Sequence, residues 1–174
     1  MSGQQVRRLT ATGISSWMLV DTRRKWLGIG VGVKLSSGAS VSYTVQHTFD
    51  NLRVQFEDFT ATRVTTTVTV TKTNHGLSVG DYVYQESSGV PFDGDHNVAS
   101  VTNANVFTYT VADSGAATSG AFGRMATARV FPHADLAALT ASGQSNYMFP
   151  PQAVRLNATI VSGFVDVTLL QQGA

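Results

Sequence analysis

The sequence has 174 residues, of which 43% are hydrophobic and only 13% are charged, and it contains no cysteine. These values exclude disulfide and thiolate chemistry and leave enough apolar residues for a real core. No apolar run is long enough for a transmembrane helix, and the N-terminus lacks the apolar stretch of a signal peptide. We therefore expect a protein made and kept, or assembled, in the cytoplasm. The low charged fraction is typical of β-rich proteins and of subunits packed against other subunits.

The formal net charge is +1, but the charges are unevenly distributed. Residues 1–34 hold six basic residues and one acidic residue, whereas residues 35–174 have a net charge of −4. A basic N-terminal segment either docks on an acidic protein surface or remains a solvated face. Two tryptophans more often anchor a core or an interface than stack nucleic acid, so nucleic acid is not predicted as a partner. The candidate contacts with a partner or a second copy are Trp17, Arg23, Arg24, Lys25 and Trp26.

The first half of the chain begins with a polar arm, residues 1–16, and a short apolar segment that can pair at a sheet edge. Alternating apolar residues then predict a hairpin over residues 29–49, with its turn at Ser37-Gly38. Glycines at positions 28, 30 and 32 occupy the other face of its first strand. Such a bare face predicts close packing by the arm or by a neighbouring subunit. The glycine spacing is not that of a dinucleotide-binding loop, and no helix follows.

Residues 61–126 differ in texture, with many threonines and turn signals about every ten residues. The segment His75-Gly-Leu-Ser-Val-Gly-Asp81 predicts a tight turn before a strand, with the Asp81 side chain hydrogen-bonded to local backbone. We predict a small β-barrel or β-sandwich module here. Its candidate exposed contacts are Tyr82, Tyr84, Phe92 and Tyr109.

The C-terminal part predicts one short helical turn within residues 131–139 and a terminal hairpin over residues 153–170, turning at Ser162-Gly163. The overall prediction is an all-β fold. A discontinuous β-sandwich or jelly-roll-like frame, residues 1–60 and 127–174, carries the inserted module of residues 61–126.

The sequence shows no chemical site. Its four histidines lack metal-ligand spacing, and we interpret Asp93 and Asp95 as turn residues instead of calcium ligands. His133 and Asp135 are interpreted as a hydrogen-bonded structural pair. No nucleophile elbow occurs. We predict no catalytic, cofactor or metal residues. The enzymatic alternative is a hydrolase that uses scattered carboxylates such as Glu57, Asp58 and Glu86.

Short motifs give the chain a resemblance to structural virion proteins of tailed bacteriophages, of the capsid decoration (cement) kind or a neighbouring type. In the frame the motifs are Gly28-Ile-Gly-Val-Gly-Val33, Tyr43-Thr-Val-Gln-His-Thr-Phe-Asp50, Phe131-Pro-His133, Leu139-Thr-Ala-Ser142, Pro151-Gln-Ala-Val-Arg-Leu-Asn157 and Ser162-Gly-Phe-Val-Asp-Val-Thr-Leu169. The insert resembles a β-module of phage tail and virion proteins through residues 75–81 and Phe92-Asp-Gly94. Together these motifs cover most of the chain.

This resemblance implies a non-enzymatic protein without cofactors. It implies a homo-oligomer, a trimer in preference to a dimer, that binds the major capsid protein on the capsid exterior and contacts no membrane. The alternative is a tail or fibre component that binds host carbohydrate through the aromatic residues of the insert.

Overall fold

The computed structural model describes residues 3–22, 26–52, 57–86, 93–112 and 118–173, which form an all-β protein with one short 3-10 helix. The all-β fold class is therefore confirmed. The chain divides into two compact units: unit 1 comprises Met1–Phe49 and Phe131–Ala174, and unit 2 comprises Asp50–Val130. In the described part of the chain, no helix is long and apolar enough to cross a membrane.

Unit 1 consists of two antiparallel sheets. Sheet A has the strand order β1 (Gly3–Leu9), β15 (Val165–Gly173), β4 (Trp26–Leu35) and β13 (Gly143–Tyr147). Sheet B has the order β12 (Phe131–Pro132), β5 (Ser40–Thr48), β14 (Ala153–Ser162) and β2 (Gly13–Ile14), and β3 (Met18–Leu19) also pairs with β14. The helix η1 (Ala134–Leu136) follows β12, where a helical turn was predicted.

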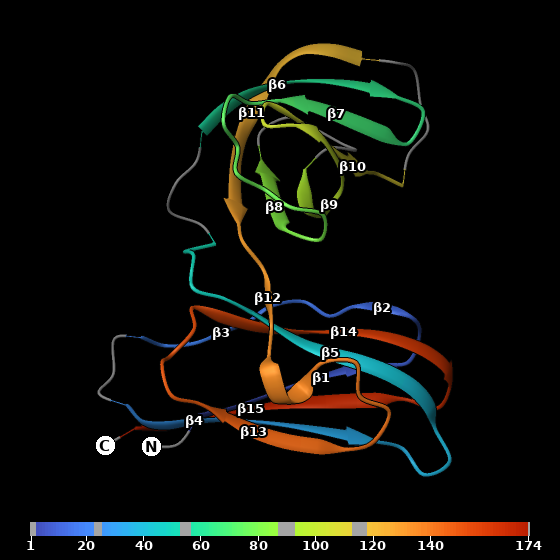
Figure 1. The fold of residues 1–174 in the computed structure, drawn as a ribbon, viewed down its shortest axis with the longest axis vertical. Helices are drawn as coiled ribbons and strands as arrows, with labels where there is room; N and C mark the ends of the chain where they lie inside the picture. The colour runs from blue at the N-terminus through green and yellow to red at the C-terminus, as the bar shows by residue number, and fades with distance from the viewer. Residues whose placement is uncertain (1–2, 23–25, 53–56, 87–92, 113–117, 174) are drawn as a thin grey trace. The chain divides into compact units, whose positions relative to one another are not determined.

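Both predicted hairpins of the frame are wrong in their pairing. The strands exist, but β4 pairs with β15 in sheet A, whereas β5 pairs with β14 in sheet B. Figure 1 shows the two red strands, β14 and β15, in different layers, each beside a strand from the blue or cyan part of the chain. Period-two alternation identifies a strand and its buried face, but it does not identify the strand's partner.

The two connections between the sheets lie side by side. The Ser36 backbone N–H donates to the Phe164 carbonyl at 3.0 Å, and the Phe164 N–H donates to the Ser36 Oγ at 3.0 Å. Gly163 has a φ of +84°, and a Cβ there would meet the Ser36 Oγ at 2.5 Å and the Ala39 Cβ at 2.7 Å. Two adjacent connections, each an arch from one sheet to the other, therefore close this end of unit 1, and hydrogen bonds join them.

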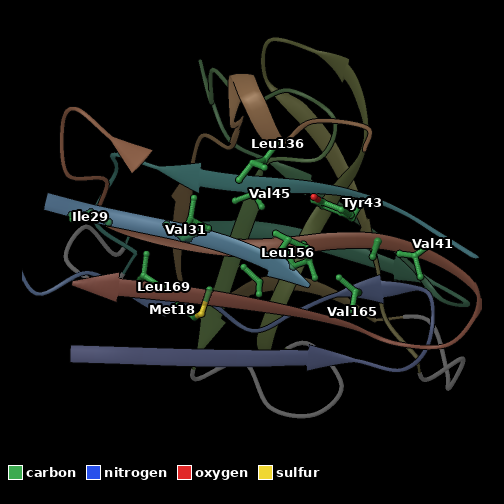
Figure 2. Close-up of a cluster of buried hydrophobic side chains, with 14 of the residues drawn as sticks. Met18, Ile29, Val31, Val41, Tyr43, Val45, Leu136, Leu156, Val165 and Leu169 are labelled. Carbon is green, nitrogen blue, oxygen red and sulfur yellow. The ribbon is translucent and has the colours of Figure 1, made fainter. Parts of the chain in front are cut away.

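The core of unit 1 lies between its two sheets. Figure 2 shows apolar side chains of β4 and β15 directed toward those of β5 and β14. The buried members contributed by these strands include Ile29, Val31, Val33, Val41, Tyr43, Val45, Val154, Leu156, Val165, Val167 and Leu169. Because the alternating apolar residues of all four strands meet in one layer, hydrophobic burial stabilises the sandwich.

Unit 2 is a closed barrel with the strand order β10, β7, β6, β11, β8 and β9. The strands are β6 (Glu57–Val64), β7 (Thr67–Thr71), β8 (Tyr82–Glu86), β9 (Gly94–Asn103), β10 (Val106–Thr110) and β11 (Thr118–Ala128). The predicted boundaries of the insert, after residue 60 and after residue 126, fall inside β6 and β11. The division into a frame domain and an inserted domain that fold independently stays a prediction.

Polar contacts join the two ends of unit 2. Arg129 donates to the Asp50 carboxylate through its backbone N–H at 2.8 Å and through Nη2 at 2.9 Å. The hydrogen bond from the Arg129 side chain is the main reason that the pKa of Asp50 is lowered. Asp81 accepts from the Ser78 N–H at 2.7 Å, as expected for the tight turn, and also from the Val130 N–H at 2.8 Å. The turn motif at residues 75–81 thus has a structural role.

Candidate interaction surfaces

Of the predicted N-terminal contacts, the structure describes Trp17 and the backbone of Trp26. The Arg155 guanidinium lies 4.5 Å from the centroid of the Trp17 ring, and the Arg155 Nε donates to the Gln46 Oε1 at 2.8 Å. Trp17 therefore lies against sheet B, whereas Trp26 begins β4 of sheet A, with only its backbone described. Residues 23–25 lie outside the described residues. A partner contact through Trp17, Arg23, Arg24, Lys25 or Trp26 stays a prediction.

The part of the chain that the structure describes does not cover the glycine face of β4. A Cβ at Gly28 or Gly32 would meet no atom within 4 Å, and one at Gly30 would meet only the Leu170 Cβ, at 3.9 Å. The expectation that the N-terminal arm packs on this face is wrong, because the arm forms β1 at the sheet edge, beside β15. The other half of the expectation, coverage by a neighbouring subunit, stays a prediction.

The outer face of sheet A forms a shallow hollow of about 500 Å³. Its lining residues are Gly30, Val31, Gly32, Gln144, Ser145, Asn146, Thr168 and Leu170. Apolar side chains border it, since Leu170 is 38% exposed and Val6, which pairs with Thr168, is 46% exposed. No lining residue is charged. Two residues beyond Val6 and Thr168 in the β1–β15 register, Arg8 and Asp166 bind each other at 2.7 Å, and Lys34 of β4 pairs with Asp166.

The expectation of exposed aromatic contacts on the insert is wrong for two of its four residues. Tyr82 is 2% exposed, and its hydroxyl donates to the Asp95 carboxylate. Tyr109 is fully buried, and its hydroxyl donates to the Gln85 Oε1. Tyr84 is half-buried, and Phe92 lies outside the described residues. Alternation along β8 and β10 indicated that these aromatic residues lie on strands. It did not indicate which of their side chains are buried inside the barrel.

We predict that Tyr109→Phe destabilises unit 2 by about 1–3 kcal/mol, because the buried Gln85 amide loses its partner. Val79→Thr, at a position of unit 2 that is 67% exposed, is the control and should change stability by less than about 0.5 kcal/mol. Hydrogen exchange of the β9 and β10 amides measures both effects. Equal protection in the two variants would contradict the role of Tyr109 in the barrel core.

One histidine of unit 2 is tied to backbone on both ring nitrogens. The His75 Nδ1 accepts from the Leu77 N–H at 3.0 Å, and its Nε2 donates to the Asn103 carbonyl at 3.0 Å. The described residues hold no group of three or more His, Asp or Glu side chains placed to bind a metal. The side chains of Glu57, Asp58 and Glu86 lie outside the described part, so the hydrolase alternative is untested.

His133 of unit 1 is held in the same way as His75. Its Nδ1 accepts from the Asp135 backbone N–H at 3.2 Å, capping η1, and its Nε2 donates to the Asn146 carbonyl at 3.3 Å. The predicted hydrogen bond between His133 and Asp135 is thus present, but the Asp135 backbone N–H makes it. The Asp135 carboxylate instead accepts from the Ser145 hydroxyl at 2.7 Å.

His133 belongs to a cluster of five rings. The aromatic–histidine cluster comprises His47, Phe49, Phe131, His133 and Tyr147, and the His47 centroid lies 5.2 Å from those of Phe49 and Tyr147 and 6.3 Å from that of His133. Burial, and secondly the charge of His133, lowers the pKa of His47. The members come from three separate segments of the chain, so sequence spacing carried no signal of the cluster.

The fold and its surfaces define a β-sandwich protein with an inserted closed barrel. No protein-family model matches the sequence, and a search of curated proteins gives no match. Among solved structures, one similar chain is the phage phi92 endosialidase, with 18% sequence identity and a TM-score of 0.38. The similarity covers 77% of this chain and 21% of the endosialidase, so this chain spans about a fifth of that protein's length. A likeness this distant gives no basis for assigning an activity.

Proposed function

We propose that this protein is a non-enzymatic structural protein of a tailed-phage virion, and specifically a capsid decoration protein. It binds the major capsid protein as a homo-oligomer on the capsid exterior and stabilises the shell. The observation that carries the proposal is the outer face of sheet A, which is exposed, uncharged at its centre and hollowed over the glycines of β4. Such a face is suited to close packing by another subunit.

The surfaces that two subunits bring together lose their contact with water. Cores of protein interfaces are depleted of charge, and packing a protruding side chain into a hollow excludes water without an unpaired ion. The hollow and the exposed Val6 and Leu170 lie on the same face, so one subunit presents both a cavity and the apolar groups that fill one. In a symmetric oligomer each copy can supply both parts.

The charge distribution supports a frame that binds and a module that projects. Unit 1 holds seven basic and three acidic residues, a net of +4, whereas unit 2 holds five basic and eight acidic residues, a net of −3. A basic frame favours an acidic shell surface. Binding to the intact shell and not to its ruptured state stabilises the particle by mass action, and an oligomer that spans several sites gains from multivalency. We propose a trimer in preference to a dimer.

The second candidate, a tail or fibre component that binds host carbohydrate through the insert, has less support. Of the four aromatic residues proposed to contact carbohydrate, Tyr82 and Tyr109 are buried, and their hydroxyls form hydrogen bonds within the barrel. Tight binding on a glycan array that is lost on deletion of the insert would favour this candidate.

A charge placed in the hollow tests the decoration proposal. Gly32→Lys is expected to leave the protein folded, because its Cβ meets no atom within 4 Å, but to abolish self-association and reduce binding to undecorated expanded capsids at least tenfold. Val79→Lys is the control, since Val79 is 67% exposed on unit 2. Sedimentation and a capsid-binding titration measure both variants.

The wild-type protein should bind capsids saturably, with a stoichiometry that matches a symmetry position of the shell. Absence of saturable binding by the wild type would refute the decoration proposal. Equal binding by Gly32→Lys and the wild type would show that another face makes the contact.

A further inference from the structure

The segment from β12 to η1 is attached to the frame beside two histidines. We call residues 131–136, which comprise β12, His133 and η1, the strap. Phe131 pairs with His47 on β5, and the His133 N–H donates to the Val45 carbonyl at 2.8 Å. Leu136 at the far end of the strap is 1% exposed and belongs to the core of unit 1. Opening the strap would therefore expose both a histidine pair and a core leucine.

The hydrogen bonds of His133 are compatible with only one protonation state. Its Nδ1 must be an acceptor for the Asp135 N–H, and its Nε2 must carry the proton donated to the Asn146 carbonyl. A second proton would place an N–H against the Asp135 N–H, because a doubly protonated imidazole has no acceptor. That proton would remove the cap of η1, whereas the Nε2 donation to the Asn146 carbonyl on β13 would persist.

A second proton on His47 is also disfavoured in the closed arrangement. Its Nδ1 is buried and has no hydrogen-bond partner, and its ring lies among Phe49, Phe131 and Tyr147. A charge there would be desolvated and would face His133.

The other ionisable groups near the two histidines do not compensate such a charge. On the elements packed against the rings these are Asp135 on η1, Tyr147 on β13, Arg155 on β14 and Lys34 on β4. The Asp135 carboxylate is exposed and accepts from Ser145, and burial raises the pKa of Tyr147, which keeps it neutral. Arg155 donates to Gln46, and Lys34 lies beside Asp166, its partner in the register of β4 and β15.

We propose that the strap is an acid-sensitive latch of unit 1, closed while His47 and His133 are neutral and released from β5 when they take up protons. Well above a pH of about 6.5 His47 is neutral in both states, so the closed state keeps its full stability. As the pH falls below this value, the open state is protonated first, because burial lowers the pKa of His47 in the closed state. The closed state is then disfavoured through His47, by up to about tenfold per pH unit.

Amide hydrogen exchange of the full chain at pH 8 and pH 5 tests the latch, after correction for the intrinsic pH dependence of exchange. The amides of His133, Asp135 and Leu136 should open at least about tenfold more often at pH 5, while the Leu156 amide on β14 changes far less. The double variant His47→Phe, His133→Asn should remove the difference, because phenylalanine retains the ring contacts and asparagine retains a cap acceptor. His47→Phe alone should reduce it, which keeps the test valid if the double variant fails to fold.

His75→Asn provides the matched control. His75 has the same two backbone bonds as His133 but lies in unit 2, so the response of the strap should be unchanged in this variant. No acceleration of the strap amides in the wild type at pH 5 would overturn the proposal. An undiminished acceleration in the double variant would overturn it as well, since the protons would then act elsewhere.

Discussion

Replacing Gly163 with alanine is expected to destabilise unit 1 by about 2–4 kcal/mol. The residue has a positive φ of +84°, and a Cβ would meet the Ser36 Oγ at 2.5 Å and the Ala39 Cβ at 2.7 Å. The substitution thus adds backbone strain and also forces apart the two connections that close the sandwich. Urea unfolding followed by tryptophan fluorescence reports on unit 1, because both tryptophans, Trp17 and Trp26, lie in it.

The Gly38→Ala variant distinguishes the effect of backbone strain from the effect of a steric clash between the two connections. Gly38 has a φ of +70° but a Cβ there would meet no atom within 4 Å, so the expected loss is only about 1 kcal/mol. Equal losses at the two glycines would mean that the close contact between the arches does not contribute.

Replacing residues 50–130 with an Asn-Gly pair is expected to leave a folded frame that unfolds cooperatively. Because Phe131 pairs antiparallel with His47, unit 2 is inserted where a hairpin loop would join β5 to β12. Thr48, Phe49 and the two added residues make a four-residue hairpin loop of ordinary length. Circular dichroism and the urea transition of the two tryptophans measure the outcome.

Deleting residues 153–173 is the contrasting experiment and should abolish folding of unit 1. This segment supplies β14 and β15, which pair with β5 and β4 and carry Leu156 and Leu169 into the core. A truncated protein that still unfolds cooperatively, or an insert-deleted protein without a transition, would contradict the split-frame arrangement.

The strands and their buried faces could be predicted because alternation is local. Val41, Val45 and Leu156 face the core as their period-two spacing indicates. The partners could not be predicted, since a strand followed by a short turn forms either a hairpin or an arch between sheets, and only tertiary packing decides. Glycine is required at position 163 because a side chain there would meet the neighbouring arch. The residues of that arch are far away in sequence.

The interaction surfaces were harder to predict than the fold. Asp81 binds local backbone as its turn motif indicates, because the motif and its bonds lie within a few residues. Tyr109 was expected at the surface, but whether an aromatic side chain enters a barrel depends on strand register and closure. The aromatic–histidine cluster joins β5, β12 and β13, so its histidines gain their common environment only in the folded chain.

The most direct measurement is an electron-microscopy reconstruction of the source virion with symmetry imposed on the capsid. The decoration account predicts density that fits unit 1 at repeated symmetric positions on the outer surface of the shell, with the glycine face of β4 against a neighbouring subunit. A shell without this density, or density confined to the tail, would contradict it.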